Sequence, residues 1–502
     1  MREKRLLWNT VTAILNQAVT VVCAFILPRL ILTSYGSEVN GLIQSIQQFM
    51  AVIAFLDMGV GAVVQSSLYQ PLAKGDMDGV SRIMVSANRF FRKLAAVIGA
   101  YIAVLSVSYT FISHSSFSVG YTCTLVLALG ASYFAQYYFG LKNQLLLIAD
   151  QKAYVQNLLG IVVVILNNAL GCLLILAGFS IQTVKISTAL ILLTRPLLME
   201  LYVRRHYSIR WDIRFEGEPI RQKWNGIAQH MATVVLHSTD NIVLTLFSDL
   251  KNVSIYSVYH LVLNGMNSLV LSFTQSASAY FGNLLANREH ERLQSMFSTY
   301  ETLFHAAIVF LYSCITALIM PFVSVYTKGV SDAEYIVPLF AYLICGANMV
   351  YCLRLPYNSL VLSAGHYKQT QSSAIIEMAL NLVISVAAVI RFGLVGVALG
   401  TLAAMLYRST YLAWYAVKHI LRQKSLRWLL HFAVDLLCVL IVVDVSGSFA
   451  MSSPAFYAWI VLAIKVGAVS LLVTVGVNAL VFGKNLHLRQ MLLILKRKKN
   501  DE

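Results

Sequence analysis

Four arginines of this chain lie inside long apolar stretches, where a charged side chain is costly unless it has a partner or a ligand. Arg354 lies two residues before Pro356, a residue that loosens a helix and frees backbone carbonyls. Arg29 lies near the end of the first stretch, and Arg195 and Arg408 lie midway along two others. A guanidinium stays protonated and binds phosphate oxygens in pairs. These positions are therefore typical of a site for a phosphorylated substrate, with Arg354 as the first choice.

Each arginine also has a structural interpretation. Arg354 could pair with a carboxylate and hold two helices together, and Arg29 could extend to the headgroup region. Arg195 and Arg408 occupy corresponding places in an internal repeat, which favours a scaffold role because binding sites diverge after duplication. Three acidic residues in apolar stretches are expected to be structural: Glu200, Glu377 and Asp435.

Other polar residues in apolar stretches suggest ion coupling or sugar binding. Asp57 could pair with a substrate-binding arginine, bind H+ or Na+, or form an ion pair within its own bundle. His237 and Asp240 lie three residues apart and so share a helix face. This couple could take up a proton and drive a conformational cycle, or form a structural hydrogen bond. Asn264 and Asn267 have the same spacing, and could bind sugar hydroxyls or link helices.

The elements that must position these residues are membrane-spanning helices. The chain of 502 residues is 58% hydrophobic and only 12% charged, with a mean hydropathy of +0.70. That charge content is too low to cover a soluble surface. Apolar runs long enough to cross a bilayer recur along the chain and predict about fourteen helices. The predicted spans are 8–32, 42–68, 89–112, 120–148, 154–178, 182–205, 224–247, 254–286, 298–322, 335–362, 367–390, 394–419, 427–446 and 456–482.

The formal net charge of +16 follows the membrane topology. Lys and Arg concentrate in alternate loops, chiefly 69–93, 204–223 and 418–427, whereas the intervening loops, such as 33–41, are nearly free of cations. This distribution predicts that both termini are cytoplasmic and makes a nucleic-acid partner unnecessary. The seven cysteines lie in apolar runs without metal-ligand spacing, so neither a metal site nor a disulfide framework is expected.

Similar segments recur at a separation of roughly 210–216 residues. Gln65-Ser66-Ser67-Leu68-Tyr69 and Gln275-Ser276-Ala277-Ser278-Ala279-Tyr280 are one such pair. The repeat predicts two six-helix bundles in the same orientation, with the substrate path between them. The predicted divisions are 1–206 for the first bundle, 207–223 for a basic linker, 224–422 for the second bundle, and 423–502 for helices 13 and 14 with a basic tail.

The first 90 residues carry the most recognisable motifs. They are Tyr35-Gly36-Ser37 at the first turn, Asp57-Met58-Gly59 in the second helix, and Leu68-Tyr69 at the exit into a charged loop. Together with the helix count, they resemble the polysaccharide-biosynthesis flippases of the multidrug/oligosaccharidyl-lipid/polysaccharide (MOP) exporter superfamily. The resemblance implies an all-α membrane protein with two bundles in a V shape, like MATE and MurJ transporters. It also implies that helices 13 and 14 offer a groove for a lipid tail.

The sequence therefore predicts a transporter of the bacterial cytoplasmic membrane. Its substrate would be a polyprenyl-diphosphate-linked oligosaccharide, flipped to the outer leaflet by alternating access, with polysaccharide polymerases or glycosyltransferases as partners. A cation-coupled multidrug exporter is the first alternative, although it would favour carboxylates over arginines. A membrane polymerase or ligase is the second, but the chain has neither a large extramembrane loop nor an ATP-binding GxxxxGKS motif. We expect no enzyme activity and no cofactor, while H+ or Na+ coupling and the identity of the saccharide stay open.

Overall fold

The computed structural model describes residues 2–53, 60–113, 117–213, 238–423, 426–451 and 453–482. Within these ranges the secondary structure comprises fifteen bounded α-helices, a further helical stretch at 238–247, and two π-helical segments. Nine of the described helices are long and apolar enough to cross a bilayer, as expected for a multi-pass membrane protein. The chain divides into two compact units, Met1–Ser257 and Val258–Glu502.

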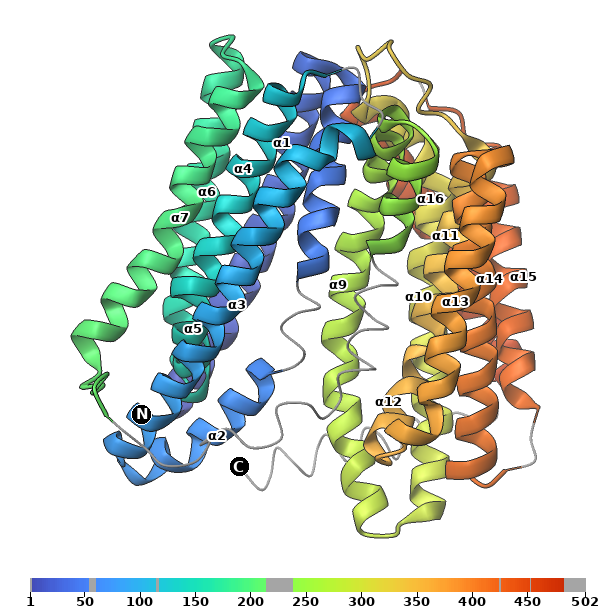
Figure 1. Cartoon of the computed structure of the whole chain (residues 1–502). Helices are drawn as coiled ribbons and strands as arrows, with labels where there is room; N and C mark the ends of the chain where they lie inside the picture. Colours follow the sequence, from blue (N-terminus) through green and yellow to red (C-terminus); the bar gives the residue numbers. More distant parts are fainter. Residues whose placement is uncertain are drawn as a thin grey trace. The chain divides into compact units, whose positions relative to one another are not determined.

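Unit 1 is built from helices that are mostly longer than a bilayer crossing requires (Figure 1). Residues 238–247 are also helical, and α9 (Leu250–Ala286) begins in unit 1 and continues into unit 2. The helices of unit 1 are α1 (Arg2–Ala51), α2 (Val60–Lys74), α3 (Met77–Ile112), α4 (Val119–Ala135), a π-helical segment (Gln136–Gly140), α5 (Leu141–Ala149), α6 (Ala153–Leu176) and α7 (Ile181–His206).

The predicted loop 33–41 is shorter than expected, because α1 comprises two helical stretches that meet at a kink at Gly36. Gly36 adopts φ 85° and ψ 174°, and helical residues lie on both sides. A positive φ is readily adopted only by glycine, so a single residue replaces the expected loop. The first predicted span and the start of the second therefore lie on either side of this kink.

Unit 2 contains the remaining helices, of which α14 continues directly into a π-helical turn. They are α10 (His290–Tyr326), α11 (Pro338–Leu353), α12 (Leu355–Ser363), α13 (Tyr367–Phe392), α14 (Leu394–Tyr415), the π-helical segment (Ala416–Ile420), α15 (Arg427–Gly447) and α16 (Phe456–Phe482). Predicted spans 4 and 10 each appear as two consecutive helices, α4 with α5 and α11 with α12.

Helix boundaries in the two units repeat at nearly constant spacing. The nine-residue helices α5 and α12 start at Leu141 and Leu355, a difference of 214 (355 less 141). The following helices, α6 and α13, start at Ala153 and Tyr367, again 214 apart (367 less 153). The break in the preceding helix falls at the same point in both units, at Gly140 in one and Arg354 in the other. The position of this irregularity is therefore repeated, although only unit 1 has a π-helical segment there.

Close packing of α13 against α14 depends on two glycines spaced four residues apart. A Cβ at Gly396 would lie 2.4 Å from the carbonyl carbon of Ala388, and one at Gly400 would lie 2.2 Å from Ser385 Oγ. Lipid supplies no hydrophobic force between helices, so small residues that allow close approach are the usual contact. This approach brings α14 within side-chain reach of the polar face of α13.

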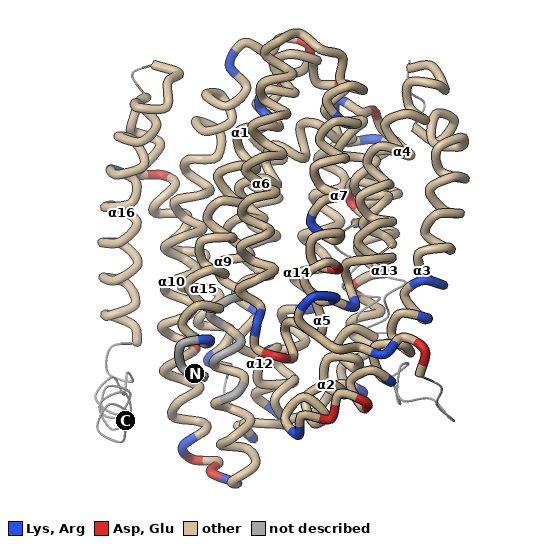
Figure 2. The backbone as a smooth tube through the Cα atoms, turned by 90° about the vertical axis from the view of Figure 1, so that its left-hand side faces the viewer, with Lys and Arg blue, Asp and Glu red and all other residues tan. Residues whose placement is uncertain are grey.

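Charged residues are rare along the helix bodies. In Figure 2 the Lys and Arg of unit 1 gather around α2, α5 and the start of α3, and most of the helix length carries other residues. This arrangement is typical of helices whose middle portions lie in hydrocarbon. The few charges that do lie deep are the natural starting point for a site.

Candidate functional site

The break between α11 and α12 places Arg354 inside unit 2, facing α13. Arg354 Nη1 donates a hydrogen bond to Glu377 Oε1. Its guanidinium also lies over the ring of Tyr351, with 4.6 Å between Cζ and the ring centroid. Arg354 and Glu377 are 8% and 5% exposed, so this ion pair is shielded from solvent. The predicted substrate arginine therefore has a carboxylate partner.

Arg408 joins the same group from α14. Its Nη1 donates to the carbonyl of Thr370 at 2.8 Å and to Ser373 Oγ. Its Nε lies 3.7 Å from Glu377 Oε2. The three side chains, Arg354, Glu377 and Arg408, form what we call the arginine cluster. With two cations and one carboxylate, the cluster carries a net charge of +1.

The structure separates the other predicted arginines from this cluster. Arg195 lies in α7 over Gly160, beside Asn16 of α1, and its buried Nε has no hydrogen-bond partner among the residues that the structure describes. Arg29 is half-buried in α1. Both belong to unit 1, whereas the three residues of the arginine cluster belong to unit 2.

The polar pairs have diverse environments. Asp240 is buried and accepts a hydrogen bond from the Tyr256 hydroxyl at 2.8 Å. Asn264 is exposed on α9, whereas Asn267 is half-buried. Two predicted residues, Asp57 and His237, lie outside the described residues.

Asn267 links three helices of unit 2. Its amide donates to Asn348 Oδ1 at 2.8 Å, and its carbonyl oxygen accepts from the Tyr312 hydroxyl at 2.7 Å. Cys352 Sγ lies 3.2 Å from the same oxygen. These contacts connect α9, α10 and α11, as expected for a polar residue that joins helices in a membrane.

A second buried polar group, the histidine–carboxylate cluster, connects α10 to α15. His305 Nδ1 lies 2.6 Å from Asp435 Oδ2, and His431 Nε2 lies 3.6 Å from Glu301 Oε2. The Tyr357 hydroxyl donates to Glu301 Oε1. The side chains of the two histidines and the two carboxylates are each at most 6% exposed. The cluster therefore anchors α15 through ionisable groups that water does not reach.

Sequence analysis identified only Asp435 of this cluster. The sequence pattern that could have revealed the cluster is a pair of ionisable residues four apart on each helix. On α10 the pair is Glu301 and His305. On α15 it is His431 and Asp435. Such pairs share a helix face. No group of these residues, or of others within the described ranges, has the arrangement of a metal site.

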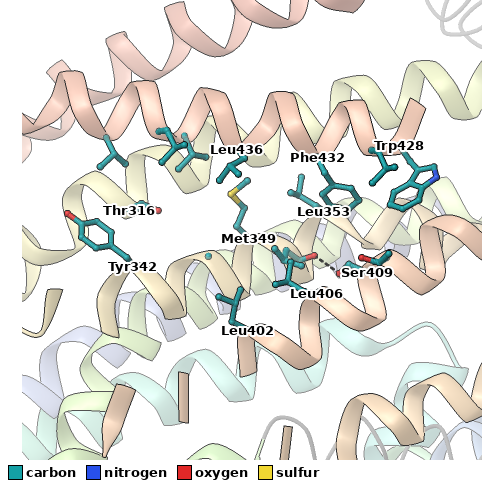
Figure 3. Close-up of a pocket in the computed structure, with 17 residues that line it drawn as sticks. Thr316, Tyr342, Met349, Leu353, Leu402, Leu406, Ser409, Trp428, Phe432 and Leu436 are labelled. Atoms are coloured by element: carbon teal, nitrogen blue, oxygen red, sulfur yellow. Dashed lines mark hydrogen bonds between the residues drawn. The ribbon is translucent and has the colours of Figure 1, made fainter. Parts of the chain in front are cut away.

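An apolar groove runs between α14 and α15, with α11 as its floor (Figure 3). The cavity measures about 620 Å³. Leu402 and Leu406 line it from α14, and Trp428, Phe432 and Leu436 line it from α15. The Ser409 hydroxyl bonds the carbonyl of Val350 at 3.0 Å and so is turned away from an incoming ligand. The groove is therefore suited to a hydrocarbon chain.

The fold is that of the transporters of the MOP superfamily. The lipid II flippase MurJ, in an inward closed conformation, superposes with a TM-score of 0.66 and 13% identity over 95% of this chain and 99% of its own. A MATE multidrug resistance transporter in an inward-facing conformation gives 0.60 and 14% over 82% and 99%. A MOP transporter from Pyrococcus furiosus gives 0.56 and 12% over 84% and 97%.

These three proteins are transporters rather than enzymes, and their likeness to this chain is one of fold. No protein-family model matches the sequence, and no curated protein matches it. The substrate therefore has to be argued from the residues themselves.

Replacing Glu377 with Gln should lower the free energy of unfolding by about 3 kcal/mol or more, because two buried guanidinium groups would lose their shared carboxylate. The measurement is thermal unfolding of the detergent-purified protein. Glu291→Gln, which neutralises an exposed carboxylate on α10, is the control and should unfold like the unmodified protein. Equal stability of the two variants would contradict a charge-balancing role for Glu377.

Replacing Asp435 with Asn should destabilise the protein by about 2–3 kcal/mol, because His305 would lose its buried anionic partner. Asp444→Asn removes an exposed carboxylate from the same helix and should have little effect. The same unfolding assay compares the two. If Asp444→Asn proves equally harmful, the loss reflects α15 itself rather than the cluster.

Proposed function

We propose that this protein is a flippase for a polyprenyl-diphosphate-linked oligosaccharide. It would act in the bacterial cytoplasmic membrane, with both termini in the cytoplasm, and move its substrate to the outer leaflet by alternating access of the two repeated bundles. The apolar groove of unit 2 is the observation that carries this proposal. A lipid tail needs an apolar surface of this kind along its length.

The position of the groove relative to the arginine cluster supports a substrate with both a tail and a phosphate. Leu353 and Ser409 line the groove, and each directly precedes or follows a cluster residue, Arg354 or Arg408. The charges therefore lie on helix faces next to the groove wall. With a net charge of +1, the cluster is suited to a diphosphate rather than to a cationic drug.

An ion-coupled drug exporter is the second candidate, and the histidine–carboxylate cluster favours it. Buried histidines and carboxylates are the side chains that carry protons within membranes. The same cluster would serve a flippase driven by a proton gradient. The substrate, rather than the ion, therefore distinguishes the two candidates.

Filling the groove should block lipid transport. Gly346 lines it, and a Cβ at this position would have no other atom within 4 Å. Gly346→Phe should therefore fold normally and reduce flipping about tenfold or more, by occupying the path of the tail. The assay uses proteoliposomes loaded with polyprenyl-diphosphate oligosaccharide and an impermeant enzyme that cleaves outward-facing sugar.

Gly476→Phe is the matched control, since Gly476 on α16 has the same open surroundings but lies outside the groove lining. The Gly476→Phe variant should flip the lipid-linked oligosaccharide at close to the normal rate. Normal flipping by Gly346→Phe would remove the groove from the lipid path. Absence of flipping by the unmodified protein, with export of cationic drugs, would favour the exporter.

Replacing Arg354 with Ala should abolish flipping and leave folding intact. Glu377 would keep Arg408 as its partner, so the remaining pair would be neutral while the surplus positive charge disappears. The same assay measures the effect, and thermal unfolding checks the fold. Arg391→Ala, at an exposed position near the end of α13, is the control. Normal transport by Arg354→Ala would leave that arginine with a structural role alone.

A further inference from the structure

Unit 1 contains a polar cavity of about 640 Å³ that the proposed function does not use. It lies between the first half of α3, the start of α5 and the end of α7, and the segment after α7 covers it. We call it the basic pocket. Its lining comprises Val85, Asn88, Arg89, Arg92, Lys142, Glu200, Val203, Arg204, Tyr207, Ile209 and Trp211.

The lining holds four cations, Arg89, Arg92, Lys142 and Arg204, but only one carboxylate, Glu200. Its net charge is therefore +3. Glu200 is shared, at 3.1 Å from Lys142 Nζ and 2.9 Å from Arg204 Nε. Because one carboxylate pairs with two cations, the pocket keeps a surplus of positive charge. This surplus favours an anionic ligand.

Lys142 forms the floor of the basic pocket. Its side chain is only 3% exposed, and Nζ donates to Asn88 Oδ1 at 2.9 Å. Nζ also lies 4.9 Å from the centroid of the Trp211 ring. A cation so well shielded interacts more strongly with a charged ligand than a cation on an open surface does.

The segment after α7 is held in place over the pocket. The backbone N–H of Arg210 donates to Ser81 Oγ at 3.1 Å, and the Arg210 side chain pairs with Asp78. Both contacts tie the segment to α3 and so position Trp211 over Lys142. Burial, with a hydrogen bond to Asp150, raises the pKa of the Tyr207 hydroxyl. Tyr207 therefore adds no negative charge to the lining.

A general bias toward cytoplasmic cations does not explain this arrangement. That bias requires only cations near the helix ends, and exposed residues such as Lys93 and Arg205 satisfy it without lining the pocket. Arg92 and Arg204 directly adjoin them but face the cavity. Basic pockets between helices at a membrane surface are suited to phosphorylated headgroups. Arginine also provides paired donors for phosphate oxygens.

We propose that the basic pocket binds a phosphate-bearing anion, a phosphomonoester or a diphosphate, at the membrane surface. The site is independent of the flippase proposal, because the arginine cluster and the apolar groove belong to unit 2. Such a group would lie between Arg92 and Arg204, above Lys142, and would offset the surplus charge. A lipid headgroup and a free phosphate share this chemistry.

The test is isothermal titration of the full chain, purified in detergent, with two probes: inorganic pyrophosphate and short-chain phosphatidic acid. Short-chain phosphatidylcholine is the neutral-headgroup control. The variant Arg92→Gln with Arg204→Gln should lose about tenfold or more in affinity, because each charge-assisted hydrogen bond contributes substantially. Both arginines are exposed, and Glu200 would keep Lys142 and Asn143 as partners, so the fold should persist.

The charge-matched control is Lys93→Gln with Arg205→Gln, which should change affinity by less than about twofold. Binding of phosphatidic acid alone would identify a lipid headgroup site. Binding of both probes would identify a site for phosphate itself. Equal losses in the two double variants, or no binding of either anion by the unmodified protein, would overturn the proposal.

Discussion

The balance of charge inside each helical unit is the constraint on which the rest of this structure depends. A bilayer offers no water to solvate a guanidinium or a carboxylate, so each deep charge must find its partner within the protein. Glu377 meets that requirement for both Arg354 and Arg408, and in doing so ties α11, α13 and α14 together. The close approach of α13 and α14 at Gly396 and Gly400 makes these contacts short enough to form. Helix packing and charge balance are therefore two aspects of one arrangement.

The two units repeat the positions of the helices, but the functional side chains on those helices differ. At a spacing of 214 residues, Arg354 corresponds to Gly140 and Glu377 corresponds to Val163, so unit 1 lacks the arginine cluster. Lys142, the floor of the basic pocket, corresponds to Pro356 in unit 2. The shared helix break therefore supports different residues in the two units.

The sequence predicted those features that depend on local properties. Apolar length located the helices, and the cost of a buried charge identified Arg354 and Arg408 before their surroundings were known. Their partnership through Glu377 could not be predicted, because it depends on how α13 packs against two other helices. The loop at 33–41 was predicted too long, because one glycine, Gly36, forms the kink between the two helical stretches. The histidine–carboxylate cluster was missed although its spacing of four was visible on both helices.

The apolar groove lies along a face of α15 other than the one that carries its buried polar contacts. His305–Asp435 and the neighbouring Glu301–His431 contact attach α15 to α10, and the Phe482 ring of α16 stacks on His431 with 4.0 Å between centroids. On another face, Phe432 and Leu436 line the cavity, while Trp428 near the start of α15 belongs to the same buried apolar cluster as Leu412 of α14. Polar contacts can hold a helix at a few points, whereas apolar packing in lipid requires a continuous interface. A helix fixed in this way can leave one face open to a hydrocarbon chain and still keep its place. The histidine–carboxylate cluster and the apolar groove are thus connected through α15, whose buried polar contacts hold the helix that forms one wall of the groove.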